Sequence, residues 1–237
     1  MSKVFEKHET LFCILLIVVY LLSNSVCMQA FGEISVAGAV VNTVLSGGLL
    51  GLILALKRRE YYGLVGVKHA KECLYFILLA LILTVNLWTG IHISKPVEEI
   101  VLHILTMLNV GFIEEIVFRG FLFRMMEKTN ERSAVWVSAL TFGVGHVINL
   151  LNGAPLIPTL LQIGYAVAIG YLFVILFRKS GSLIPCIVTH SLMNALSVLN
   201  QENDLYRYIS GAFLTVVPIV YALIINKRKN KGHDDDA

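Results

Sequence analysis

The chain has 237 residues, of which 57% are hydrophobic and only 15% are charged. A water-soluble domain usually has about a quarter of its residues charged and fewer than half apolar, so this composition excludes an ordinary soluble domain. The formal net charge of +3 is small and arises from short basic loops, so it gives no indication of a nucleic-acid partner.

The apolar residues fall in long blocks, which is typical of helices that cross a lipid bilayer. We predict an all-α, polytopic protein with one integral membrane domain over residues 1–237, built as a bundle of about eight transmembrane helices. The predicted spans, in chain order, are 11–30, 34–56, 73–93, 99–125, 134–151, 156–177, 182–199 and 208–226. Residues 226–237 are highly charged, and we expect a disordered cytoplasmic tail there.

Two features of the first spans allow alternative interpretations. The first span follows a basic start, as a signal peptide would, but no clean cleavage site of small residues follows it, so we expect it to be retained.

In the second span, Gly47 and Gly51 form a small-xxx-small pair. Such a pair favours close packing between helices of the same chain, with a dimer interface as the alternative.

The basic residues predict the orientation of the bundle. Sixteen of the nineteen Lys and Arg residues lie before the first span, after the last span, or in alternate loops, whereas the other loops carry only Lys95 and Arg207. Because Lys and Arg accumulate in cytoplasmic loops, this bias predicts that both termini are cytoplasmic. The nineteenth basic residue, Arg119, is the only one expected within the bilayer, since Arg124 lies at the inner end of the fourth span and is counted with the loop that follows it.

The fourth span contains three ionisable side chains, Glu114, Glu115 and Arg119. An ionised group near the centre of a bilayer costs between about 2.5 and 17 kcal/mol, so such groups usually serve a function. Glu115 and Arg119 are four residues apart, on one helix face and within pairing distance. Glu114 points about 100° away and has no obvious partner on its own helix, which suits a general base.

Two later spans contribute further polar groups. His146 follows Phe142 by one turn in the fifth span, and His190 precedes Asn194 by one turn in the seventh. Counting the rise of 1.5 Å per residue places Glu114, His146 and His190 roughly 12–18 Å below the cytoplasmic surface. We therefore predict one shared polar cavity in the inner half of the bundle. Two other histidines, His92 and His103, lie nearer the outer interface, and we expect them to be tolerated interfacial residues.

The combination of a carboxylate, a histidine that can hold water and a His/Asn donor pair suits the attack of water on a carbonyl carbon. The sequence therefore predicts hydrolysis of an amide bond. Zinc held by Glu114, His146 and His190 is the alternative mechanism, since three such ligands plus water satisfy zinc, although no HExxH pair is present. A proton relay or transporter is disfavoured, because the first three spans contain no counterparts of these groups.

Three patterns in this order resemble one known family. Glu114-Glu115-xxx-Arg119, Phe142-xxx-His146 and His190-xxx-Asn194 are similar to the three motifs of the CAAX protease and bacteriocin-processing family, also called Abi or CPBP, over roughly residues 98–200. The resemblance implies an eight-helix intramembrane glutamate-dependent endopeptidase whose cavity opens to the cytoplasm. It implies that Glu114 and His146 activate water, that His190 and Asn194 stabilise the oxyanion, and that Glu115 and Arg119 support the site.

The resemblance also implies the surroundings of the enzyme. The expected substrate is a peptide or prenylated protein tail, with lipid around the bundle. The very short loops favour a compact prokaryotic member, so the expected location is the cell membrane of a prokaryote. No cofactor is expected in the glutamate-dependent mechanism. Three branches of the family remain open: cleavage of prenylated tails, processing of bacteriocins or signalling peptides, and regulatory or immunity proteins that bind a peptide without cutting it.

Overall fold

The computed structural model describes residues 7–67, 74–201 and 203–227. Every regular element in these residues is a helix. The elements are α2 (Glu9–Phe31), α3 (Val36–Ala55), α4 (Ile77–Leu83), η2 (Val85–Leu87), α5 (Val97–Glu115), η3 (Ile116–Phe123), α6 (Arg124–Glu127), α7 (Glu131–Gly145), α8 (Ile148–Leu151), α9 (Leu156–Ser180), α10 (Ile184–Leu196), η4 (Ser197–Leu199) and α11 (Asp204–Lys227).

These elements combine into eight helical segments that match the eight predicted spans. Six segments are long and apolar enough to cross a membrane, which identifies a multi-pass integral membrane protein. The other two, Leu74–Leu87 and Ile184–Leu199, are shorter. The third predicted span, 73–93, was too long, because the helix ends at Leu87 and Gly90 adopts a φ of +89° that an L side chain rarely tolerates. Residue 73 lies outside the described residues.

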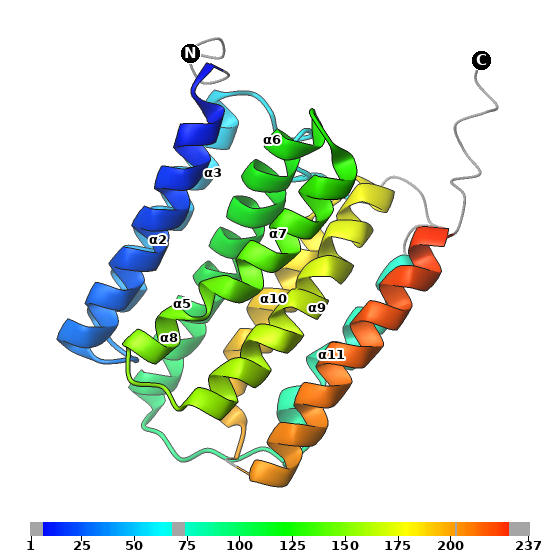
Figure 1. The fold of residues 1–237 in the computed structure, drawn as a ribbon. Helices are drawn as coiled ribbons and strands as arrows, with labels where there is room; N and C mark the ends of the chain where they lie inside the picture. Colours follow the sequence, from blue (N-terminus) through cyan, green and yellow to red (C-terminus); the bar gives the residue numbers. More distant parts are fainter. Residues whose placement is uncertain (1–6, 68–73, 202, 228–237) are drawn as a thin grey trace.

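The bundle is built around α9 (Figure 1). This helix packs between α7 and α11, and α5 packs between α3 and α10. From Ala168 to Phe177, every residue of α9 is buried, whereas the other long spans have a smaller share of their residues buried. The exposed residues on those helices include large apolar side chains such as Leu11, Val101 and Leu223, which is the surface that a lipid environment requires.

Figure 1 shows that the start of α2 and the end of α11 lie at the same end of the bundle, beside α6. We call this the basic end, because its described residues include Lys57, Arg58, Arg59, Arg124, Lys128, Arg132, Arg178, Lys179 and Lys227. Ion pairs join helices there: Lys128 contacts Glu9 at 2.5 Å, and Arg178 contacts Glu131 at 2.6 Å. The cytoplasmic location of this end remains a prediction. Of the predicted tail, Asn226 and Lys227 belong to α11, and 228–237 lie outside the described residues.

The Gly47–Gly51 pair does not pack inside the bundle, so the expectation of internal packing was wrong. Both glycines are exposed on α3, and within the described chain no atom of another segment lies within 4 Å of the position that a Cβ atom would occupy. The close helix contact occurs at Gly111 on α5 instead. A Cβ atom there would lie 2.5 Å from Ser191 Oγ and 2.6 Å from Ser191 Cα on α10.

The contact between Gly111 and Ser191 sets the distance between α5 and α10. Ser191 Oγ also donates a hydrogen bond to the carbonyl oxygen of Leu108, at 2.9 Å. His190 is the neighbour of Ser191, and Glu114 and Glu115 lie one turn after Gly111, so this contact holds the two polar motifs side by side.

Replacing Gly111 with Ala will therefore destabilise the protein. The added methyl group must push α10 away from α5, and overpacking of this kind costs about 1–3 kcal/mol. The measurement is the thermal unfolding midpoint of the purified protein in detergent. Gly164→Ala on α9 is the matched control, because no neighbouring atom lies within 4 Å of its Cβ position. Equal midpoints for the two variants would contradict the proposed contact.

Candidate active site

The fourth span changes its helical geometry directly after the two glutamates. α5 ends at Glu115, and residues Ile116–Phe123 form a π-helix in which all eight residues are buried. Such segments are rare and occur frequently at functional sites. The sequence pattern predicted a continuous α-helix here, so the π-helix is a difference that the structure reveals.

Glu115 is the hydrogen-bond acceptor for two basic side chains, Arg119 and His190. Its Oε1 atom accepts hydrogen bonds from Arg119 Nη1 at 3.1 Å and from His190 Nδ1 at 2.8 Å. The side chains of Glu115 and Arg119 are both completely buried. The pairing predicted from their spacing is therefore confirmed, and His190 from the seventh span joins it. A buried charge requires such partners, because desolvation alone costs several kcal/mol per ion.

The guanidinium group of Arg119 also stacks on aromatic rings. Its Cζ atom lies 4.2 Å from the centroid of Phe142 and 5.8 Å from that of Phe173. A Cβ atom at position 170 would lie 2.9 Å from Arg119 Nη2, so glycine at this position leaves room for the guanidinium. Among the described residues, Arg119 Nε and Nη2 have no hydrogen-bond partner. The face of the ring is the main stabilising contact on this side.

Phe142 lies between the two histidines of the later motifs. Its ring centroid is 5.3 Å from that of His146 and 5.6 Å from that of His190, with both pairs nearly perpendicular. Arg119 of the first motif and His190 of the third thus lie against the aromatic ring of the second motif.

Glu114 lies at the edge of this cluster, where it faces the cavity. Its Oε2 atom is 3.3 Å from His190 Nε2, which is an ion-pair distance, and its Oε1 atom accepts a hydrogen bond of 2.8 Å from the hydroxyl of Tyr20. Only 12% of the Glu114 side chain is exposed. Tyr20 belongs to α2, and the sequence analysis missed it, since a tyrosine in an apolar span has no distinguishing pattern.

His146 lies where the fifth span is interrupted. α7 ends at Gly145 and α8 begins at Ile148. Two backbone hydrogen bonds close the turn between them: the N–H of Val147 donates to the carbonyl oxygen of Val144, and the N–H of Asn149 donates to that of His146. Nδ1 of His146 is 3.1 Å from the carbonyl oxygen of Phe142. Because a carbonyl only accepts, Nδ1 carries the hydrogen, and in the neutral ring Nε2 is left as an acceptor.

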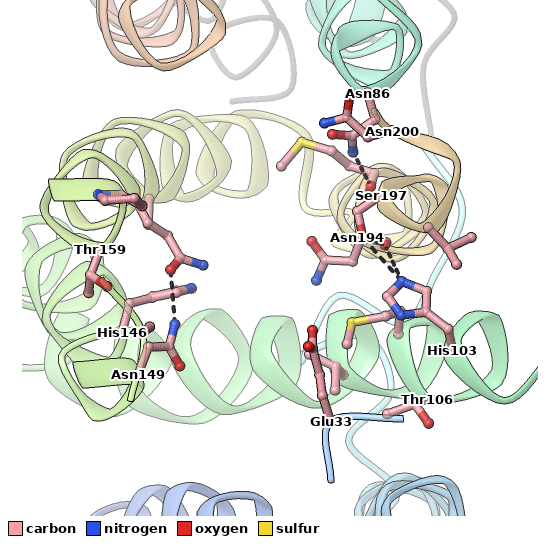
Figure 2. A pocket seen from close by; sticks show the side chains of 18 of the residues that line it. Glu33, Asn86, His103, Thr106, His146, Asn149, Thr159, Asn194, Ser197 and Asn200 are labelled. Atoms are coloured by element: carbon pink, nitrogen blue, oxygen red, sulfur yellow. Dashed lines mark hydrogen bonds between the residues drawn. The ribbon is translucent and has the colours of Figure 1, made fainter. Parts of the chain in front are cut away.

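These groups line a cavity of about 1310 Å³. Figure 2 shows His146 and Asn149 on one wall, with Asn194 and Ser197 across the pocket from them. The Asn194 amide points into the open space (Figure 2). Glu114, Phe142 and His190 line the cavity as well, whereas Glu115 and Arg119 lie behind them and support them.

His103 is part of this wall, so its interpretation as an interfacial residue was wrong. It is buried, and its Nε2 atom lies 3.2 Å from the carbonyl oxygen of Asn194 and 3.1 Å from Ser197 Oγ. His103 thereby holds the chain segment that carries Asn194.

The cavity extends away from the basic end of the bundle. Its lining continues to residues 32–34, to Ser94 and Lys95, and to Asn203 and Arg207, which lie where α2, α5 and α11 begin or end opposite the basic end. We call this region the mouth. The sequence analysis predicted both cytoplasmic termini and a cavity open to the cytoplasm. These two expectations disagree, because the start of α2 and the end of α11 lie at the end of the bundle opposite the mouth.

The predicted zinc ligands Glu114, His146 and His190 do not fit a metal site in this arrangement. Both ring nitrogens of His190 face carboxylates, at 2.8 and 3.3 Å. Residues 7–67, 74–201 and 203–227 contain no group of three or more His, Cys, Asp or Glu side chains that could hold a metal ion.

Comparison with known proteins agrees with this geometry. Residues 96–196 match the family described as Type II CAAX prenyl endopeptidase Rce1-like. No curated protein and no solved structure gives a significant match. The matched segment contains all three motifs, from Glu114 to Asn194, and excludes Tyr20. The resemblance predicted from the motifs is thereby confirmed, and residues 96–196 are a domain of the Rce1-like type II CAAX prenyl endopeptidase family.

Proposed function

We propose that this chain is an intramembrane endopeptidase that hydrolyses a peptide bond in a membrane-associated peptide or protein tail. The observation that carries the proposal is the position of Glu114. It is a nearly buried carboxylate, 3.3 Å from His190 and 2.8 Å from Tyr20, at the inner limit of a polar cavity that His146 also lines. It lies within the segment that matches an endopeptidase family.

Glu114 and His146 are suited to activate water. Glu114 takes one proton from a water molecule, and the Nε2 atom of His146 accepts a hydrogen bond from the other. The water oxygen then forms a bond with the carbonyl carbon of the substrate. The proton on Glu114 passes to the amide nitrogen as the C–N bond breaks, so the products are a carboxylic acid and an amine.

His190 and Asn194 are suited to stabilise the oxyanion of the tetrahedral intermediate. They lie one turn apart on α10, and the Asn194 amide points into the cavity (Figure 2). Glu115 holds His190 Nδ1 at 2.8 Å, which keeps Nε2 directed at Glu114 and the cavity. With both nitrogens protonated, His190 donates from Nε2, and an amide and an imidazolium placed in advance supply the donors that such a transition state needs.

The four charged groups of the site balance one another. When Glu114 and Glu115 are ionised and His190 and Arg119 are cationic, their formal charges sum to zero. Opposite charges alternate through the contacts Glu114–His190, His190–Glu115 and Glu115–Arg119. Charge balance allows the cluster to lie at membrane depth, where an unpaired ion is very costly.

A protein that binds a peptide without cutting it is the second candidate. The same polar cavity favours it, because a cavity of about 1310 Å³ accommodates a peptide whether or not the peptide is cleaved. Only a measurement of bond cleavage separates the two functions.

Replacement of Glu114 with Gln will abolish cleavage while the protein still inserts into the membrane. Gln keeps the shape and cannot take a proton, so the rate falls by about 10²–10⁴-fold. The measurement is a mass-spectrometric comparison of the peptides released by cells that produce the wild type or the variant. Glu33→Gln at the mouth is the control. A peptide released equally by all three proteins would remove Glu114 from the mechanism, and no wild-type-specific peptide would favour the binding function.

Replacement of His190 with Ala, or of Asn194 with Ala, will lower kcat much more than it changes KM. A donor that acts mainly on the transition state contributes about 10²–10³-fold to kcat. The measurement is steady-state cleavage of the peptide identified above. If KM rises while kcat is unchanged, these residues hold the substrate and do not stabilise the oxyanion.

Removal of the Tyr20 hydroxyl in Tyr20→Phe will lower kcat by about tenfold with little change in KM. The hydroxyl positions Glu114 by a charge-assisted hydrogen bond, which is worth roughly 1.5–3 kcal/mol. Tyr165→Phe is the matched control, since Tyr165 also lines the cavity. Equal losses in both variants would indicate a general effect of altering cavity tyrosines.

A further inference from the structure

The cavity has one open end and one closed end. Beyond Glu114, toward the basic end, the bundle is filled by the rings of Tyr62, Phe121, Phe123 and Phe177, which are all fully buried. Tyr62 comes from the segment after α3, and its ring lies 4.6 Å from that of Phe121. A core of this density has no passage for a peptide. Among the described residues, the cavity lining therefore leads from Glu114 to the mouth and not to the basic end.

The length of α5 gives the depth of the cavity. Val97, at the mouth, precedes Glu114 by seventeen residues, and Glu127, at the basic end, follows it by thirteen. At 1.5 Å per residue, Glu114 lies about 25 Å from the start of the helix and about 20 Å from the end of α6. The catalytic carboxylate is thus near the middle of the membrane, with open space on one side and packed side chains on the other.

The distribution of basic residues assigns a side of the membrane to each end. Of the Lys and Arg residues that the structure describes, only Lys95 and Arg207 lie at the mouth, and both contact acidic neighbours, Glu99 at 3.6 Å and Asp204 at 2.6 Å. The basic end carries most of the others. An excess of Lys and Arg marks the cytoplasmic side, so the mouth faces the other side.

We infer that the active site is entered from the extracytoplasmic side, and that its substrate is an extended peptide segment exposed on that side. The inference rests on the proposed function, because it names the substrate of the same site. The lining suits such a segment. Asparagine is its most frequent residue type, and the side chains of Asn149, Asn152, Gln162, Asn194 and Asn200 offer amide donors and acceptors. Main-chain amides of an extended peptide find matching partners in such a lining.

Thiol labelling of single-cysteine variants tests the direction of access. In a background with the four native cysteines replaced, Asn203→Cys probes the mouth, Gln162→Cys probes the cavity wall, and Ser133→Cys probes the basic end. Spheroplasts that produce each variant are treated with a membrane-impermeant maleimide before and after permeabilisation. We expect Asn203→Cys and Gln162→Cys to be labelled equally in both conditions, and Ser133→Cys to be labelled only after permeabilisation.

Two outcomes would overturn the inference. Labelling of Ser133→Cys in intact spheroplasts with protection of Asn203→Cys would place the mouth in the cytoplasm. If Asn203→Cys is labelled but Gln162→Cys is not labelled before or after permeabilisation, the cavity is closed from the side of the mouth. A reporter that is active only in the cytoplasm, fused after Ala237, measures the same orientation with the native cysteines present. Its inactivity would also overturn the inference.

The labelling result does not depend on catalysis. Glu114→Gln combined with each cysteine substitution should give the same labelling pattern as the active background. If the release experiment finds no product while the mouth is labelled from outside, the proposed endopeptidase function fails and the direction of access stands. If a product is released while the mouth is protected, the direction of access fails and the function stands.

Discussion

The buried carboxylate of Glu115 is the constraint on which the rest of the site depends. One of its oxygens accepts from both Arg119 and His190, so a single atom joins the fourth span to the seventh. Loss of Arg119 would leave the buried carboxylate without its ion-pair partner, and a broken pair of this kind costs about 3–5 kcal/mol. The orientation of His190, and through it the environment of Glu114, follows from this pair of contacts.

Small residues allow the helices to approach closely enough for these contacts. Gly111 lies against Ser191, Gly170 against Arg119, and a Cβ atom at Gly143 would lie 2.3 Å from Val167 Cγ2. In lipid, helices associate through close packing and polar contacts, because the hydrophobic effect gives no drive between apolar surfaces. The contact between α5 and α10 and the stacking of Arg119 therefore both lie next to a glycine.

The sequence was sufficient for the parts that depend on local pattern. Spans are visible because the bilayer requires about 20 apolar residues in a row, and Glu114, Glu115 and Arg119 are conspicuous in such a run. The Glu115–Arg119 pair follows from spacing alone. Other features depend on distant neighbours. The π-helix after Glu115, the hydrogen bond from Tyr20 and the wall position of His103 arise from packing between helices. Counting residues along spans gave the common depth of the polar groups, but it did not show which end of the bundle was filled by aromatic rings.

The aromatic packing behind Glu114 makes the cavity a blind channel. In the part of the chain that the structure describes, the buried rings of Phe121 and Phe177 fill the bundle past Glu114, so a chain that enters the cavity leaves on the side of the mouth. Such a channel cannot thread a polypeptide and cut it repeatedly, as a degradative protease does. Under the endopeptidase function proposed above, such a channel would admit a free end or a loop and permit one scission near the deepest point reached. Both fragments would then leave by the side from which the substrate entered.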